Sequence, residues 1–355
     1  MPRLLLPHPL VDRPFSCAEG IELGLGVGRL RGADLVAPHR GVRVPVESVT
    51  HATGPRSGSH PGVGVVPQLA RALQPVMLGG WCFSHVTALA LWGLPVPPRV
   101  DSGAEPLHVT TPTGRGPRRV GVVGHRASTT KRSRASVDSP AAVALVPAPE
   151  HANAQRRSAR AGASQSPLVS APILLDGLPL DDPSSAWVRS GGLLTLDELI
   201  RVGDALAGSW SPHGLARERG LDELVAAVSE AGPIRGIAMV RQAMESVRAG
   251  VESPKETDLR LLLTRAGLPE PEINRRTYDA RGRYLGKPDL RYRWCKVAVE
   301  YEGDEHRRDR RRFRNDILRR ERFADAGWRT VRCTEDDLHG RRALEFVARV
   351  ERCLS

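Results

Sequence analysis

The alternation of apolar and polar residues is clearest in the last third of the chain, where it predicts a mixed α/β fold. Apolar residues three and four positions apart predict helices over residues 237–249 and 253–268. A turn at DARG separates two segments that predict a hairpin, and KVAVEYE follows as a strand. A basic helix over 308–326, a strand over 328–334 and a closing helix complete the order. This order predicts an α/β sandwich with a mixed sheet of about 100 residues.

The helix expected over 253–268 has sequence signals for its start and for its end. Ser253 is a suitable N-cap, Pro254 occupies the first helical position and Glu256 stands at the third, as in a capping box. Gly267 is suited to end the helix.

The first part of the chain predicts mainly helices with short strands. Residues 14–46 predict a helix, a second short helix and the strand RGVRVP, a pattern that fits a small helix-turn-helix with a wing. FSHVTALALWGLP predicts a helix with Ser84 as a possible N-cap. Two strands are expected at residues 107–112 and 119–126.

Residues 127–170 lack periodic apolar positions and are rich in Ser, Ala and Arg, so we expect a disordered insert or linker. Two helices are expected after it, over 194–207 and 221–232. The expected organisation is therefore multidomain: a winged-helix-like region at 1–66, an α+β region at 67–126, the insert at 127–170, a helical continuation at 171–235 and the α/β domain at 236–355.

Composition narrows the class of partner. The 355 residues carry a formal net charge of +12, and nucleic acid is the commonest polyanion that binds such a surface. A generally arginine-rich composition is the alternative explanation. The five cysteines form no CxxC pair, so neither a zinc ribbon nor a disulfide framework is expected. No apolar run approaches the roughly 18 residues of a membrane span, and we expect a cytoplasmic protein without a membrane partner.

The stretch VAVEYEGDEH carries an unusual pair of carboxylates. In a strand, Glu300 and Glu302 point to the same face, where like charges about 4 Å apart repel by roughly 4 kcal/mol at an effective dielectric near 20. Asp289 lies on a neighbouring expected strand, and Glu256 lies in the preceding helix. A divalent ion such as Mg²⁺ or Mn²⁺ would offset the repulsion, bind phosphate and activate water.

Each of these residues also has an ordinary structural interpretation. Glu256 can simply complete the capping box, and Asp289 can accept a hydrogen bond in a turn. Glu300 and Glu302 can lie on a solvated edge, paired with Arg291 and Arg293. His306 alone would be an ordinary loop histidine, so the site hypothesis depends on the combination.

That combination resembles the very-short-patch-repair-like (Vsr-like) endonuclease domain of the PD-(D/E)XK nuclease superfamily. The resemblance covers residues 250–354 and is carried by the helix glutamate, PDL, EYEGDEH and the GWRTVRC segment. It implies a restriction-endonuclease-like fold and a Mg²⁺-dependent DNA endonuclease. It further implies that Asp289 and Glu300 are metal ligands, Glu302 a third acidic ligand, Glu256 an outer ligand and His306 an acid/base or phosphate contact.

This chain departs from the superfamily pattern at one position, where Glu302 replaces the usual lysine. The cation that stabilises charge would then come from elsewhere, and Lys287, Lys296, Arg307 and Arg308 are the candidates. The helix RRDRRRFRNDILRRER contains nine arginines. A solvated charged face is the usual interpretation of such a run, but beside carboxylates it would suit a phosphate-bearing substrate, with contacts from Lys287, Arg307, Arg308, Arg311 and Arg314.

The N-terminal part resembles the regulatory region of AbiEi-type antitoxins, through residues 14–45, FSHVTALALWGLPVP, and GLPLDDPSSAWV followed by LDELIRVGDAL. The resemblance implies a DNA-binding winged helix. Two functions remain open: a DNA endonuclease with an N-terminal DNA-binding region, or an antitoxin-like DNA-binding regulator whose nuclease fold is inactive. Action on RNA is a third possibility. Glu302 in place of lysine favours the regulator.

Overall fold

The computed structural model describes residues 5–47, 65–112, 116–127, 171–208, 220–303 and 310–355, with the side chains of 310–317 excluded. The disordered insert expected at 127–170 therefore lies almost wholly outside the described residues. The chain forms two compact units, each made of two stretches of sequence. Unit 1 comprises Met1–Glu198 and Glu223–Gln242, and unit 2 comprises Leu199–Asp222 and Ala243–Ser355.

Unit 1 begins with a small antiparallel sheet in the order β1-β3-β2. Ser16 caps the short helix of this region, because its Oγ accepts a hydrogen bond from the backbone N–H of Glu19 at 3.0 Å. Leu10, Phe15, Leu25 and Leu30 form its core. The helix, short helix and strand expected over residues 14–46 are present as α1 (Cys17–Glu22), a 3₁₀ turn (Arg29–Arg31) and β3 (Val42–Pro45), with β1 (Phe15–Ser16) and β2 (Leu35–Val36) completing the sheet.

A second sheet in unit 1 has five strands in the order β6-β5-β4-β8-β7. The two strands expected at 107–112 and 119–126 are confirmed as β5 (Leu107–Thr111) and β6 (Val122–Arg126), which pair in parallel. The other strands are β4 (Cys82–Phe83), β7 (Ile173–Leu175) and β8 (Leu178–Leu180). The helices α3 (Val65–Leu73), α4 (His85–Leu91), α5 (Pro98–Asp101) and α6 (Pro183–Arg189) belong to unit 1. The next three helices contain residues of both units: α7 (Leu196–Ala207), α8 (Gly220–Glu230) and α9 (Ile237–Ser246).

Unit 2 contains the mixed sheet that the sequence predicts, in the order β14-β13-β12-β9. The β9–β12 and β12–β13 pairs are antiparallel, and β13–β14 is parallel. The expected hairpin is present as β10 and β11, which pair outside this sheet. The elements are α10 (Pro254–Arg265), β9 (Glu272–Ile273), β10 (Thr277–Tyr278), β11 (Tyr284–Gly286), β12 (Leu290–Tyr292), β13 (Val297–Tyr301), α11 (Arg310–Asp325), β14 (Arg329–Cys333) and α12 (Gly340–Leu354).

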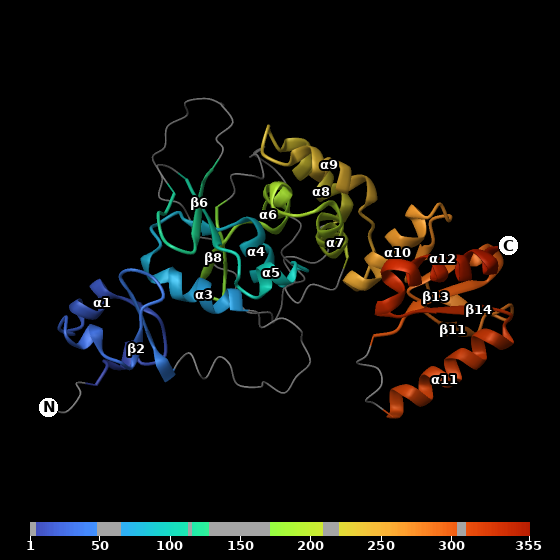
Figure 1. Cartoon of the computed structure of the whole chain (residues 1–355), viewed down its shortest axis with the longest axis horizontal. Helices are drawn as coiled ribbons and strands as arrows, with labels where there is room; N and C mark the ends of the chain where they lie inside the picture. The colour runs from blue at the N-terminus through green and yellow to red at the C-terminus, as the bar shows by residue number, and fades with distance from the viewer. Residues whose placement is uncertain (1–4, 48–64, 113–115, 128–170, 209–219, 304–309) are drawn as a thin grey trace, which may run out of the picture. The chain divides into compact units, whose positions relative to one another are not determined.

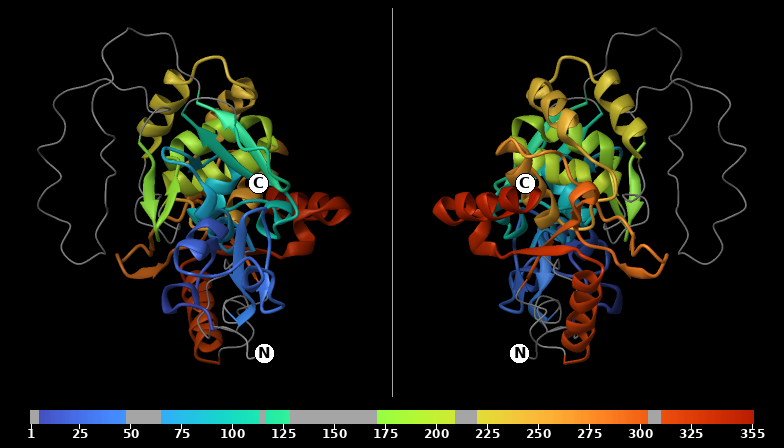
Figure 2. Two further views of the ribbon diagram at one scale, coloured as in Figure 1. Left: turned by 90° about the vertical axis from the view of Figure 1, so that its left-hand side faces the viewer. Right: turned by 90° about the vertical axis from the view of Figure 1, so that its right-hand side faces the viewer.

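The alternation along β13 places its side chains in two separate apolar layers. Val297 and Val299 pack with residues of α10 and α12, whereas Ala298 packs with Phe323 and Trp328 on the other face. Helices α11 and α12 accordingly lie on opposite sides of the sheet (Figures 1 and 2). The face shared by Ala298 and Glu300 is therefore the face that α11 covers.

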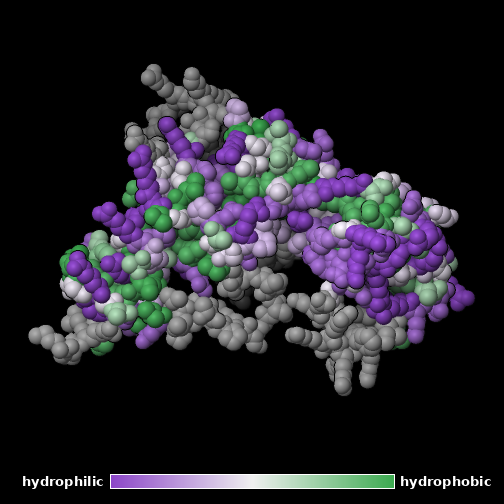
Figure 3. All heavy atoms as spheres, in the orientation of Figure 1, coloured by the Kyte–Doolittle hydropathy of each residue, from purple (hydrophilic) through white to green (hydrophobic). Residues whose placement is uncertain are grey.

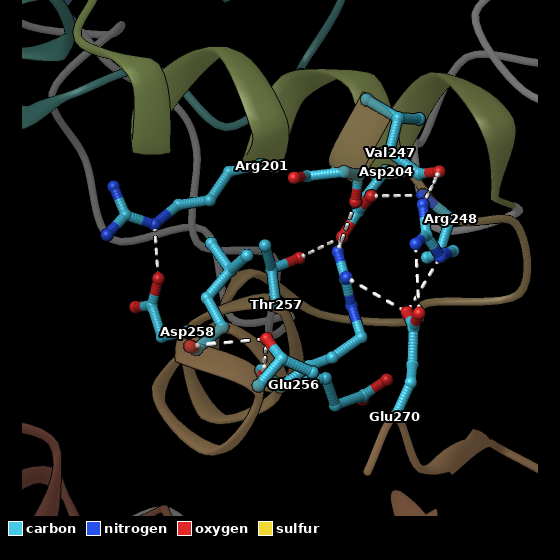
Figure 4. A network of polar contacts seen from close by, with 12 residues as sticks. Arg201, Asp204, Val247, Arg248, Glu256, Thr257, Asp258 and Glu270 are labelled. Atoms are coloured by element: carbon cyan, nitrogen blue, oxygen red, sulfur yellow. Dashed lines mark hydrogen bonds and ion pairs between the residues drawn. The ribbon is translucent and has the colours of Figure 1, made fainter. Parts of the chain in front are cut away.

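A buried ion pair joins α10 to α7 within unit 2 (Figure 4). Arg260 Nη2 lies 2.9 Å from Asp204 Oδ2, and the two side chains are 2% and 0% exposed. Asp204 also accepts hydrogen bonds from Thr257 Oγ1 and from the backbone N–H of Arg248. Burial outweighs these partners and raises the pKa of Asp204. Removing either partner of such a pair is costly, because the other charge stays buried without its closest counter-ion.

Figure 3 shows mainly hydrophilic residues on the face of unit 2 that is turned toward the viewer. In the part of the chain that the structure describes, no helix combines the length and apolar character needed to cross a bilayer.

Candidate functional site

The backbone of β13 fixes the position of Asp289. This residue immediately precedes β12, and its Oδ2 accepts a hydrogen bond of 2.7 Å from the N–H of Tyr301. Its own carbonyl oxygen accepts from the N–H of Asn274 at 2.9 Å. Leu290 is paired with Val299, so the same antiparallel register brings Asp289 opposite Glu300. The structure thus places Asp289, just before β12, opposite Glu300 of the neighbouring strand β13.

Glu300 and Glu302 lie on the same face of the sheet, as the sequence predicts, and both contact arginines. Arg319 of α11 donates to Glu300 Oε1 at 2.6 Å. Glu302 Oε1 lies 3.1 Å from Arg320 and 2.6 Å from Arg332. These guanidinium groups offset the repulsion between the two carboxylates, a role that the sequence analysis assigned to a metal ion.

Glu256 is held by the turn that starts α10. Its carboxylate accepts hydrogen bonds from the N–H of Glu252 at 2.8 Å, from Ser253 Oγ at 3.0 Å and from Asn274 Nδ2 at 2.6 Å. Ser253 Oγ in turn accepts from the N–H of Glu256, so the expected N-cap is confirmed. Nearby, Lys287 pairs with Glu252. Burial raises the pKa of Glu256 despite these donors.

The pKa of Asp289 depends on Glu256, Glu252 and Arg319, so these groups belong to one site. Burial raises the pKa of Asp289 to about 6, against the hydrogen bond from Tyr301. The negative charges of Glu256 and Glu252 raise the pKa further, and the positive charge of Arg319 lowers it. A carboxylate that is hard to ionise among other carboxylates is a site where a cation would be stabilised.

The donor set fits Mg²⁺ through two carboxylates. Protein Mg²⁺ sites use one or two carboxylates together with water and substrate phosphate oxygens, and Asp289 and Glu300 can supply such a pair. Glu302 is directed to Arg320 and Arg332. Among the described residues, Asp289, Glu300 and Glu302 do not bring one carboxylate oxygen each within 4.8 Å of one another.

Several predicted contacts cannot be placed. His306, Arg307 and Arg308 lie outside the described residues, and the side chains of Arg311 and Arg314 are excluded although their backbone belongs to α11.

The sequence analysis missed the arginines that contact the acids. Arg332 could have been found from the predicted strands, because it follows GWRTV at the position that pairs with Glu300 in the parallel register. Arg319 and Arg320 belong to the basic helix, but the periodicity of the helix does not show which arginines reach the sheet.

A second polar group was also missed. His85, His108 and His125, in unit 1, each offer a ring nitrogen within 4.8 Å of the others. Their separations in sequence match no short metal-binding motif, and only the pairing of the strands reveals the group.

Comparisons of the chain with protein-family models, with curated proteins and with solved structures found no match.

Proposed function

We propose that unit 2 is a metal-dependent DNA endonuclease that hydrolyses phosphodiester bonds. The observation that carries the proposal is the placement of Asp289, at the start of β12, opposite Glu300 of the adjacent strand β13 in the mixed sheet, with arginines of α11 at the same face. The order α10, β9, β12, β13, α11, β14 also agrees with the restriction-endonuclease-like fold that the sequence resemblance implies.

The chain's own residues would divide the work of this reaction. Asp289 and Glu300 would hold Mg²⁺ or Mn²⁺, which supplies charge stabilisation and an activated water when bound. The N–H of Tyr301 fixes the orientation of the Asp289 carboxylate. Arginines on the α11 face would bind the phosphate backbone, which carries affinity without reading sequence.

The Arg319 guanidinium and a bound metal ion would compete for the carboxylate of Glu300. The guanidinium contacts Glu300 and also affects Asp289 electrostatically. A metal ion bound between these two acids would therefore compete with Arg319 for Glu300. Released in this way, the guanidinium would be available to a phosphate oxygen of the substrate.

A second candidate function is supported by the same contacts. Because Arg319, Arg320 and Arg332 already compensate Glu300 and Glu302, the acids can be stable without a metal. Unit 2 would then only bind DNA, as in an antitoxin-like regulator. Under either function, the small β1-β3-β2 sheet with α1 is proposed as a winged-helix DNA-binding region.

The deciding experiment is cleavage by the purified chain. Plasmid, mismatched duplex, single-stranded DNA and RNA are incubated with Mg²⁺, Mn²⁺ or EDTA. We expect DNA cleavage that needs the metal and that falls at least about 100-fold in Asp289→Asn and Glu300→Gln, since each removes several kcal/mol of metal-dependent stabilisation. Glu272→Gln, on an exposed part of β9, is the matched control and should keep full activity.

DNA binding without cleavage under every metal condition would reject the endonuclease and leave the regulator. Cleavage that is unchanged in both Asp289→Asn and Glu300→Gln would place the active site elsewhere. Cleavage confined to RNA would change the substrate class.

A further inference from the structure

Three histidines of unit 1 converge from separate elements. His108 lies on β5, His125 lies on β6, and His85 is the first residue of α4. In the parallel β5–β6 register, Thr110 pairs with His125, so His108 and His125 share one face of the sheet, one diagonal step apart. The N–H of Ser84 donates to the carbonyl oxygen of His108 at 3.0 Å, which brings the start of α4 to the same place.

The rings are close enough to share a ligand. His108 Nδ1 lies 2.8 Å from His125 Nε2, and the rings of His85 and His125 stack with centroids 3.7 Å apart. One nitrogen from each of the three side chains lies within 4.8 Å of the others. His108 is buried, and the other two histidines are partly buried.

The backbone of His85 adopts a conformation that non-glycine residues rarely adopt. Its φ is +52°, in the left-handed region, which costs on the order of 1–2 kcal/mol for a residue with a Cβ. Ser84 Oγ lies 2.9 Å from His85 Nδ1. This contact engages Nδ1 and makes Nε2 the nitrogen for a ligand, as partners of metal-binding histidines commonly do.

Burial has the largest effect on the pKa of each of the three rings. Burial lowers the pKa of His108 to about 4 and lowers the pKa of His85 and His125 as well. Arg189 lowers the pKa of His85 and His125 further, and it forms an ion pair of 3.1 Å with Asp181.

We propose that His85, His108 and His125 form a binding site for a divalent transition-metal ion of the Zn²⁺ class. Imidazole nitrogens at about 2.0–2.1 Å from Zn²⁺ lie about 3.3 Å apart in a tetrahedral site. The 2.8 Å separation of His108 and His125 needs to widen by about 0.5 Å, and the ring of His85 needs to move out of its stack on His125 so that the in-plane lone pairs converge; three metal bonds would replace one hydrogen bond and one ring stack. Three protein ligands leave a fourth position for water or an anion.

The ligand type also separates this site from the carboxylates of unit 2. Imidazoles select Zn²⁺, Co²⁺, Ni²⁺ or Cu²⁺, whereas carboxylates select Mg²⁺ or Mn²⁺. The two sites can therefore be loaded and removed independently, and the histidine site does not depend on the proposed nuclease activity.

The test uses the untagged 355-residue chain, from which metal is first removed with a chelator. The chain is then incubated with Zn²⁺ or Co²⁺, and a desalting column removes the unbound ions. Elemental analysis should give about one ion per chain, and Co²⁺ should show the intense visible absorption of a tetrahedral site. Zn²⁺ should also raise the thermal midpoint, because the ion binds the folded state. His108→Ala and His125→Ala should each weaken Zn²⁺ binding at least about 10-fold.

Two variants serve as controls. His339→Ala alters an exposed histidine of unit 2, and Asp289→Asn alters the proposed Mg²⁺ site; both should keep the full Zn²⁺ content. His125 lies on the edge strand β6, so His125→Ala is expected to fold even where the buried His108→Ala does not. A stripped wild-type chain that takes up no Zn²⁺ would overturn the proposal and leave a hydrogen-bonded histidine stack. A Zn²⁺ content unchanged in His125→Ala would equally overturn it.

Discussion

At the scale of single residues, the carboxylates of unit 2 show how the local environment sets the pKa of an aspartate. Asp289 and Asp279 are both aspartates close to strand ends, yet burial raises the pKa of Asp289 to about 6, whereas backbone hydrogen bonds lower the pKa of Asp279. Asp279 accepts hydrogen bonds from the N–H groups of Arg281 and Arg283 in an exposed turn. The two residues should therefore affect stability in opposite directions.

Replacing Asp289 with Asn should stabilise the protein at neutral pH. Because the folded pKa of about 6 exceeds the unfolded value of 3.8, the folded state holds a proton that the unfolded state has lost between these values. Stability consequently falls as pH rises from about 4 to 6 and stays low above that. Urea unfolding of Asp289→Asn in metal-free buffer should show a gain of about 1–3 kcal/mol at pH 7.5 that disappears near pH 4.

Asp279→Asn provides the contrast. Its depressed folded pKa contributes stability above the unfolded pKa that is lost as pH falls through the folded pKa. This variant should be destabilised at pH 7.5 and resemble wild type at low pH. A loss of stability in Asp289→Asn at pH 7.5 would contradict the raised pKa of Asp289.

At the scale of elements, α10 depends on α7. The Asp204–Arg260 ion pair is buried on both sides, and Thr257 of α10 adds a hydrogen bond of 2.8 Å to Asp204. Arg201 of α7 pairs with Asp258 of α10 as well. The contacts join residues that are more than fifty positions apart in sequence, so α7 belongs to the structural support of the carboxylate site.

Asp204→Ala should cost up to about 3–5 kcal/mol in the free energy of unfolding, because it removes the closest counter-ion of the buried Arg260 guanidinium and leaves only the longer contact of 3.5 Å to Glu270. The double variant Asp204→Leu with Arg260→Met removes both charges and should recover at least half of that loss. Urea denaturation of the two variants beside wild type measures the difference. A double variant less stable than Asp204→Ala would show that the charge is not what makes the single change costly.

Elements with strong local signals were predictable from sequence, and long-range contacts were not. The cap at Ser253, the turn between β10 and β11 and the alternation in β13 each depend on a few adjacent residues. The contacts of Glu300 with Arg319 and of Asp204 with Arg260 depend on packing between elements. The histidine group depends on strand register over 17 and more residues, for which the sequence carries no periodic signal.

At the scale of the whole molecule, the units are not consecutive segments. The sequence pattern placed the last domain boundary at residue 236, whereas unit 2 also includes Leu199–Asp222. A fragment that starts at residue 236 would contain Arg260 but would lack Asp204. Truncation at residue 236 would therefore remove part of unit 2 as well as the N-terminal region proposed to bind DNA.

The fragment 236–355 should be less stable than the fragment 193–355, because it lacks Asp204, the closest ion-pair partner of Arg260, and Arg201, the ion-pair partner of Asp258. Chemical denaturation of both fragments tests this expectation. Arg260→Met should reduce stability more in the longer fragment, where it leaves the buried Asp204 without its ion-pair partner, than in the shorter fragment, which lacks Asp204. Equal stabilities of the two fragments would show that α7 is dispensable for unit 2.

The interleaving of the two units also sets an order of events during synthesis. Unit 1 lacks Glu223–Gln242 until the ribosome has made the first part of unit 2, and unit 2 is completed only with the last helix. At about 5–20 residues per second, the 44 residues from 199 to 242 take roughly 2–9 s to emerge. During that interval unit 1 lacks the second of its two stretches. The chain is thus more dependent on protection from premature association than a protein whose domains are made one after the other.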